Sequence, residues 1–431
     1  MAPLRTDVCP VRTAQHGRGL VAAKALPPET VVILADAPIA AVQALCPRPQ
    51  LSHAPRACAA CLRFVGDAAS QLRDLVAGTN DAALEHCSPE CRLRVECSGS
   101  LALTQVTLSS PAVVRIGPEL VRLALALVSS HGRDALSRAP LAEFHRAPFE
   151  SRGAHTTNAA DARDIAECWR ALSRVRGSGA AALPSVSDFS LLLGLVATNA
   201  IEVKVPHPLV FELSELSKSH VPADRRRLAK WAPLLEQLVD ARGADQDKFA
   251  DALSGDGGSG DGSSGEESSG DGSSSEESDD GDEAVQLVIP RAALGKRDLV
   301  FASTAFPPSR GIALYPTVAQ LNHSCEPNCQ VVWAHTPAAE ATVIATRRVK
   351  AGEELCISYV DTRLGVDERR AALARRYGFV CTCARCTAEW SAHSRKKGSA
   401  KRKDAHEQRQ AKRVPRGAAR KRIRHIESLC A

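Results

Sequence analysis

The distribution of cysteines constrains the fold of this chain more than any other feature of its sequence. Cys381, Cys383 and Cys386 offer three thiolates within six residues. A structural zinc ion takes four ligands in a tetrahedral arrangement, so a fourth must come from elsewhere in the chain, and Cys325 is the natural candidate. Unless the three cysteines are incidental, one ion must hold two distant segments together.

A second cysteine group lies nearer the N-terminus. Cys58-x2-Cys61 and Cys87-x3-Cys91 have the spacing to complete one tetrahedron of thiolates. The chain holds 15 cysteines, no apolar stretch typical of a secretory signal at its start, and no apolar run of the roughly 20 residues that span a bilayer. Disulfides rarely persist in the reducing interior of the cell, so we interpret the clustered cysteines as ligands of two zinc ions. A further site could form in this region, although the spacing fits no reliable ligand pattern, from Cys46, His53, His86 and Cys97.

Charge is distributed unevenly along the chain, whose formal net charge is +6. Residues 254–283 contain 11 acidic residues, no basic residue and nothing apolar to bury, so they are predicted to form a disordered acidic loop with a net charge of −11. Residues 393–431 carry 14 lysines and arginines against 3 acidic residues, a net charge of +11, and are predicted to form a mobile basic tail. The tail would act as a nuclear-import signal or a phosphate-binding arm, or would simply be solvated. The opposite charges motivate the hypothesis that the acidic loop is autoinhibitory.

Hydrophobic periodicity predicts an α+β fold, with strands at both ends of a helical middle. Short β-rich runs separated by turns predict strands within 19–40. Apolar residues recur at helical spacing in 118–130, 161–174, 187–196 and 228–238. Further strands are predicted at 285–289, 299–302, 331–333, 341–345 and 355–359, and a last helix at 366–377.

Five motifs occur in order between residues 15 and 390. They are His16-Gly17-Arg18-Gly19-Leu20, Thr198-Asn199-Ala200-Ile201, Leu314-Tyr315-Pro316 leading to Asn322-His323-Ser324-Cys325, Gly352-Glu353-Glu354-Leu355 leading to Tyr359, and Tyr377-Gly378-Phe379-Val380-Cys381. This order resembles that of the SET-domain lysine methyltransferases, and within them the SET and MYND type.

The resemblance implies a pocket for S-adenosylmethionine. In such enzymes the turn Gly17-Arg18-Gly19 lets the backbone approach the cofactor closely, because glycine has no Cβ. The resemblance also assigns polar contacts with the methionine end to Asn199, Asn322 and His323, and stacking on the adenine to Phe379. Taken singly, each of these residues would be interpreted as part of a turn or a loop cap, so the expectation depends on their joint order.

The resemblance also places two tyrosines at the reaction centre. A lysine amine with a pKa of about 10.4 must lose its proton before it can attack a methyl group. A narrow, dry channel beside a sulfonium would disfavour the charged amine. Tyr359 would orient the amine and, in contact with the cofactor, hold the methyl group in line, while Tyr377 would form another wall of the channel. General-base action by the Tyr359 phenol stays open, and on its own motif Tyr359 would be a core aromatic residue of a strand.

Two features depart from the family pattern. A MYND finger binds two zinc ions through cross-braced ligand pairs, of which only the first and third are visible here, so the resemblance implies a degenerate finger with one ion. The connection between Asn199 and Tyr315 is unusually long, which puts the geometry of the substrate groove in question.

The expected boundaries are 12–45 for the first part of the SET domain, 46–98 for the degenerate finger, 99–186 for a helical insertion, 187–253 for a core segment with an atypical helical insertion, 254–283 for the acidic loop, 284–362 for the catalytic core, 363–392 for a zinc-binding post-SET segment and 393–431 for the tail.

These expectations describe an enzyme of the nucleus or the cytoplasm. It would be a monomer, with no membrane segment, that methylates a lysine of a protein substrate, with histones among the candidates. One alternative is a catalytically silent SET module that serves as a scaffold or reader. The other is a nucleic-acid-binding protein that acts through the basic tail, with zinc units as supports.

Overall fold

The computed structural model describes residues 7–13, 17–44, 56–77, 86–97, 110–132, 134–151, 162–175, 183–254, 287–290, 293, 298–301, 305–333 and 339–391. The predicted basic tail, the predicted acidic loop beyond Ser254, and both Cys46 and His53 lie outside these residues. The domain boundaries given above stay predictions.

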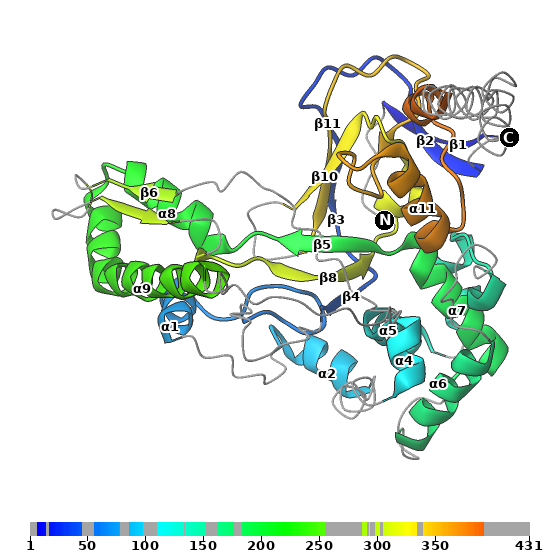
Figure 1. The fold of residues 1–431 in the computed structure, drawn as a ribbon, viewed down its shortest axis with the longest axis horizontal. Helices are drawn as coiled ribbons and strands as arrows, with labels where there is room; N and C mark the ends of the chain where they lie inside the picture. The colour runs from blue at the N-terminus through cyan, green and yellow to red at the C-terminus, as the bar shows by residue number, and fades with distance from the viewer. Residues whose placement is uncertain are drawn as a thin grey trace, which may run out of the picture.

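Short strands form several small sheets at the centre of the molecule (Figure 1). The first two strands are an antiparallel pair, β1 (Val8–Thr13) and β2 (Gly17–Ala22). One three-stranded sheet has the order β10 (Cys329–Trp333), β11 (Ala341–Ala345), β3 (Val31–Asp36). Another has the order β4 (Ala40–Gln43), β8 (Ser309–Leu314), β5 (Ile201–Val205). The strands predicted within 19–40 and near 331–333 and 341–345 are therefore present.

A parallel pair of very short strands joins two segments that are distant in the sequence. β9 (Asn322–His323) lies beside β12 (Cys356–Ile357), and residues 322 and 356 are paired. The strand predicted over 355–359 is thus only two residues long, because the chain leaves the sheet after Ile357 to bring Tyr359 back over His323. This pair places the Asn-His motif next to the tyrosine.

A layer of helices covers one side of these sheets. Its members are α4 (Pro111–Ile116), α5 (Pro118–His131), α6 (Ala162–Val175) and α7 (Val186–Asn199). They share one core in which α7, apolar on almost every face, is central. The helix begins where Ser185 Oγ accepts a hydrogen bond from the Asp188 N–H. The three helices predicted in this region are confirmed, and α7 continues to Asn199, which it carries to the edge of the sheet.

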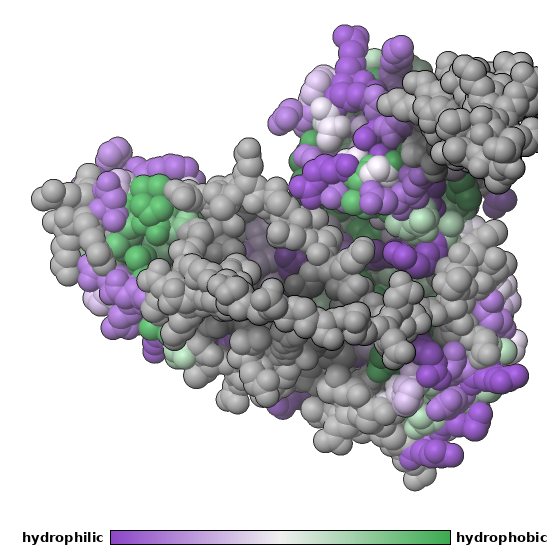
Figure 2. Space-filling view, viewed as in Figure 1, coloured by the Kyte–Doolittle hydropathy of each residue, from purple (hydrophilic) through white to green (hydrophobic). Residues whose placement is uncertain are grey.

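A second unit packs at the far end of the molecule, where β5 and β8 lead to it (Figure 1). It contains α8 (Pro208–Lys218), α9 (Pro222–Ser254), β6 (Leu287–Ile289) and β7 (Leu299–Phe301), and shares its core with α1 (Ala68–Ala77) of the finger-like region. The helix predicted at 228–238 is part of the much longer α9, so Ser254, expected to open the acidic loop, is helical. Val288 and Val300 face each other across β6 and β7 and are about half exposed, and Figure 2 shows apolar side chains gathered over β6 and α8.

The remaining helices are short or lie near the cysteines. They are α2 (Pro89–Cys97), the 3-10 helices η1 (Ala135–Ser137), η2 (Leu141–Glu143) and η5 (Val318–Gln320), α11 (Val366–Tyr377) and a helical turn over 384–391. The predicted helix 366–377 matches α11 residue for residue. Within the described part of the chain, no helix combines the length and apolar character needed to cross a membrane.

Candidate active site and metal centres

A cavity of about 780 Å³ lies where β2, β9 and β12 meet the end of α7 and the segment after α11. Its volume is within the range of about 300–1,000 Å³ that is typical of small-molecule sites. It is lined by eight of the residues that the sequence analysis assigned to cofactor binding or catalysis: Gly17, Arg18, Asn199, Asn322, His323, Tyr359, Tyr377 and Phe379. The fold therefore gathers residues from five distant motifs around one cavity.

Gly19 is the one predicted pocket residue that does not line the cavity. It lies behind the wall, where a Cβ would be 2.7 Å from Glu354 Oε1 and 2.8 Å from Asn322 Nδ2. Only glycine leaves room there for the Asn322 side chain. The Asn322 amide in turn donates to Arg18 O and to Glu354 Oε1, each at 2.8 Å. Gly19 thus acts on the cavity through the position of Asn322.

His323 is held on both ring nitrogens. Its Nδ1 accepts a hydrogen bond from the Tyr359 backbone N–H at 3.0 Å, so the proton of the neutral ring must be on Nε2. Nε2 lies 3.2 Å from Cys325 Sγ. The ring is buried, with only 7% of the residue exposed. His323 therefore connects the loop of Tyr359 directly to a cysteine of the C-terminal group.

Aromatic side chains form one side of the cavity. The ring centroids of Tyr359 and Tyr377 are 4.8 Å apart, and Phe379 lies 6.1 Å from the His323 ring and 6.4 Å from Tyr377. The Tyr359 hydroxyl donates to Leu321 O at 2.5 Å. Burial raises the pKa of Tyr359 well above its usual value, and the neighbouring Tyr377 raises it further. At neutral pH the phenol is therefore protonated, which suits a hydrogen-bond donor and not a base.

Asn199, the last residue of α7, forms another part of the cavity wall. Its Nδ2 donates to His145 O and to Leu195 O, each at 2.8 Å, and so ties the end of α7 to the loop that follows η2. The same loop presses against α7 at Gly194, where a Cβ would lie 1.8 Å from Ala147 O. This close contact positions the loop as a wall of the cavity.

The cavity also contains side chains that the sequence analysis did not single out. These are Arg12, Glu143, His145 and Gln320, and Glu143 Oε2 lies 3.9 Å from Arg18 Nη1. In the sequence, Glu143 and His145 lie in the connection between the helical segments 118–130 and 161–174, and this position is the one sequence feature that could have indicated them. That indication is weak because the two residues match no motif and reach the cavity only through tertiary packing.

The C-terminal cysteines form the group that the sequence predicted. The sulfurs of Cys325, Cys381, Cys383 and Cys386 all lie within 4.8 Å of one another, with Cys325 only 3.4 Å from Cys386. Burial, with the neighbouring thiols, raises the pKa of Cys381 to about 11. A bound zinc ion removes the proton of a coordinating thiol, and four cysteine sulfurs are its usual structural ligand set. The group therefore fits zinc and closes the cavity at the segment 377–383.

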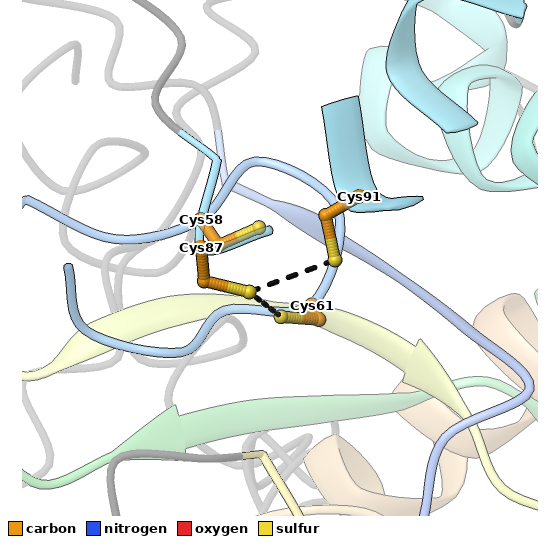
Figure 3. A group of neighbouring side chains, drawn as sticks. All are labelled: Cys58, Cys61, Cys87 and Cys91. Atoms are coloured by element: carbon orange, nitrogen blue, oxygen red, sulfur yellow. Dashed lines mark hydrogen bonds between the residues drawn. The ribbon is translucent and has the colours of Figure 1, made fainter. Parts of the chain in front are cut away.

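The cysteines of the finger-like region form a second group (Figure 3). The sulfurs of Cys58, Cys61, Cys87 and Cys91 also lie within 4.8 Å of one another, with Cys61 and Cys87 separated by 3.4 Å. Cys91 is carried by α2 (Figure 3), and its N–H donates to Ser88 Oγ at the start of the helix. His86, considered above for a further site, belongs to neither group, and the side chain of Cys97 lies outside the described part of the structure. The predicted single tetrahedron in this region is thus supported by geometry, with two zinc-like groups in the described residues altogether.

Comparison with known proteins agrees with this geometry. Residues 193–360 match the SET domain family, and this range includes Asn199, Asn322, His323 and Tyr359 of the cavity lining. Among similar proteins, histone-lysine N-methyltransferase SMYD3 of Mus musculus is 43% identical over 76 residues, 18% of this chain and 17% of the relative. Histone-lysine N-methyltransferase ATXR4 of Arabidopsis thaliana is 40% identical over 76 residues, 18% of this chain and 23% of the relative.

The name of a third relative includes both a SET domain and a MYND-type zinc finger. SET domain and MYND-type zinc finger protein 6 of Schizosaccharomyces pombe is 36% identical over 104 residues, 24% of this chain and 20% of the relative. The chain is thus similar to proteins of the SET and MYND type, and it has one cysteine group in a MYND-like position and another in a post-SET-like position. The aligned stretches span only about a fifth of the length of these relatives.

Proposed function

We propose that this protein transfers a methyl group to a lysine side chain of a protein substrate, with S-adenosylmethionine as the donor. One observation carries the proposal: Asn322, His323, Tyr359, Tyr377 and Phe379, which come from separate motifs, line one cavity that a tetrathiolate group closes. The similarity to histone-lysine methyltransferases supports the same reaction class.

The residues divide into two sets by their place around the cavity. Arg18, Asn199, Asn322 and His323 would hold the polar end of the cofactor, with Gly17 leaving it space and Phe379 stacking on its adenine. Gly19 would act indirectly, by leaving room for the side chain of Asn322. When bound, the cofactor supplies an electrophilic methyl group on a sulfonium. Tyr359 and Tyr377, 4.8 Å apart, would form the walls through which the lysine approaches.

The aromatic walls prepare the lysine for reaction. The ammonium must release its proton, and a dry aromatic channel favours the neutral amine because burial disfavours the charged form. The Tyr359 hydroxyl is fixed by its bond to Leu321 O and would orient the amine nitrogen toward the methyl group. Because burial raises the pKa of Tyr359, this residue is assigned an orienting role, and the proton leaves to solvent.

The two cysteine groups would each hold one structural zinc ion. We propose a protein partner with an exposed lysine, with histones as candidates, and a monomeric protein in the nucleus or the cytoplasm. The basic residues of 393–431 could add affinity for nucleic acid.

The first test is methyl transfer by the purified protein. It would be incubated with labelled S-adenosylmethionine and either histones or cell extract, beside Tyr359→Phe. Tyr315→Phe is the matched control, because it also removes a phenolic hydroxyl, here one that donates to Ala339 O outside the cavity. We expect Tyr359→Phe to lower the transfer rate by about 10- to 1,000-fold, as loss of a positioned polar group in a reaction site does, while the control retains activity.

Neither alternative would transfer label, and a measurement of cofactor binding distinguishes the two. A silent scaffold would bind the cofactor, whereas a protein acting only through its basic segment would not. Transfer that is equal in wild type and Tyr359→Phe would refute the role assigned to the phenol.

A further inference from the structure

One arginine of α11 is completely buried beside the C-terminal cysteine group. Arg369 has 0% exposure and is the largest fully buried side chain among the described residues. Arginine is almost never buried in this way unless its charge is paired, because a guanidinium does not give up its proton. The burial of Arg369 therefore requires negative charge nearby.

The contacts of Arg369 show where that charge lies. Its Nη2 donates to Glu389 Oε2 at 2.7 Å and to Cys386 Sγ at 3.7 Å, and its Nη1 donates to Leu364 O. The Glu389 side chain is 36% exposed and is shared with Arg385, so the fully buried partner of Arg369 is Cys386.

The cysteine group has charge to neutralise. One zinc ion neutralises two of the four negative charges that four thiolates carry, so the occupied site would keep a net charge of −2. Most of this group is buried. Negative charge left uncompensated in a protein interior is strongly unfavourable. A guanidinium 3.7 Å from one sulfur reduces that cost.

We propose that Arg369 is a positioning residue for the C-terminal zinc site, where it offsets the charge of the thiolates and fixes α11 against them. Because α11 ends at Tyr377, the same contacts hold one wall of the cavity in place. The inference rests on the proposed zinc site and not on methyl transfer.

The test compares three variants of the purified full-length protein. Arg369→Met keeps much of the side-chain volume and removes the charge and the donors. Arg369→Lys keeps the charge but cannot bridge several partners at once. Arg375→Met is the control, because Arg375 is exposed on the same helix.

Zinc content is measured by elemental analysis, and zinc release is followed with a chromogenic chelator. The wild type should release zinc in two phases, and Cys383→Ser identifies the phase that belongs to the C-terminal site. In Arg369→Met we expect that phase to be about 10- to 100-fold faster, the usual effect of losing a group that supports metal ligands. The Arg369→Lys rate should fall between wild type and Arg369→Met. Both the control and the phase of the Cys58 group should be unchanged.

Several results would overturn the inference. Release from Arg369→Met at the wild-type rate would show that the charge is not needed. Equal acceleration of both phases, or Arg369→Lys no slower than Arg369→Met, would show that the arginine only fills space. If Arg369→Met does not fold, Arg369→Gln takes its place, because it removes the charge and keeps hydrogen-bond donors: a wild-type release rate refutes the proposal and a faster one supports it. Absence of zinc from the wild type would refute the metal site itself, whatever the result of the methyl-transfer assay.

Discussion

Gly19 allows a direct test of how the cavity is built, because its hydrogen faces the side chain of Asn322. A Cβ at this position would lie 2.7 Å from Glu354 Oε1 and 2.8 Å from Asn322 Nδ2, closer than such atoms can approach. Gly19→Ala must therefore displace the hydrogen-bonded pair of Asn322 and Glu354. Asn322 also donates to Arg18 O and lines the cavity, so the displacement affects the site itself.

The expected cost follows from these contacts. Overpacking a tight site costs about 1–3 kcal/mol, and losing a hydrogen bond to a carboxylate costs about 1.5–3 kcal/mol. The two costs describe one displacement and do not add, so we expect Gly19→Ala to lower the free energy of unfolding by about 2–3 kcal/mol. If the displaced Asn322 cannot contact the cofactor, its affinity should fall about tenfold for each 1.4 kcal/mol of lost interaction.

Denaturant unfolding and calorimetric titration with S-adenosylmethionine measure the two effects. Gly352→Ala is the control: Gly352 has a φ of +78° and no atom within 4 Å of an added Cβ, and it lies outside the cavity. Alanine there costs about 1–2 kcal/mol of backbone strain without moving Asn322. The control should lose stability but keep its affinity for the cofactor. If Gly19→Ala binds the cofactor as tightly as this control, the reasoning about Asn322 is refuted.

Two further predictions concern the metal and the pH dependence. Cys381→Ser removes one thiolate of the Cys325 group, so the protein should lose about one zinc ion and keep that of the Cys58 group; elemental analysis that still finds both ions would contradict the assignment. Burial lowers the pKa of His207 to about 4, whereas the unfolded chain has its ordinary value of about 6.5. The unfolded state therefore takes up the proton first, so stability is complete above about pH 6.5 and is lost toward pH 4, by up to about 3 kcal/mol. His207→Asn keeps an acceptor for the Leu209 N–H. In urea unfolding at about pH 7 and pH 5 the variant should show a smaller difference in the free energy of unfolding than the wild type. If the difference is the same in both proteins, His207 is not its source.

The parts of the site that the sequence predicted are those that depend on chemical identity and spacing. A zinc ion needs four ligands, and three cysteines within six residues leave one to be found, so Cys325 could be identified before the structure showed it beside Cys386. The gathering of Asn322 and Tyr359 in one cavity was likewise implied by the motif order. Helices α5, α6 and α7 were predicted because their apolar residues recur at helical spacing over three or more turns.

The parts that were missed depend on tertiary packing. Glu143 and His145 reach the cavity because Gly194 lets their loop lie against α7, a contact that no local pattern encodes. Four arginines stand in the α11 sequence, and nothing in their spacing distinguishes the buried Arg369 from the exposed Arg375. The helix α8 and the full length of α9 were not predicted. Their apolar faces pack into a separate core with α1 and the β6–β7 pair, and this packing joins segments that are distant in the sequence.

Two side chains, His323 and Arg369, connect the C-terminal cysteine group to the walls of the cavity. His323 can accept the Tyr359 N–H on Nδ1 only when its proton is on Nε2, and Nε2 faces Cys325 Sγ. A thiolate held by a metal ion is a hydrogen-bond acceptor, so ligation of Cys325 and the orientation of Tyr359 favour the same tautomer of the ring. On the other side of the same cysteine group, Arg369 ties α11 and hence Tyr377 to the sulfurs. Both tyrosine walls of the cavity are thus attached to the cysteine group by polar contacts, so a metal ion bound there would help to set the geometry of the proposed lysine channel.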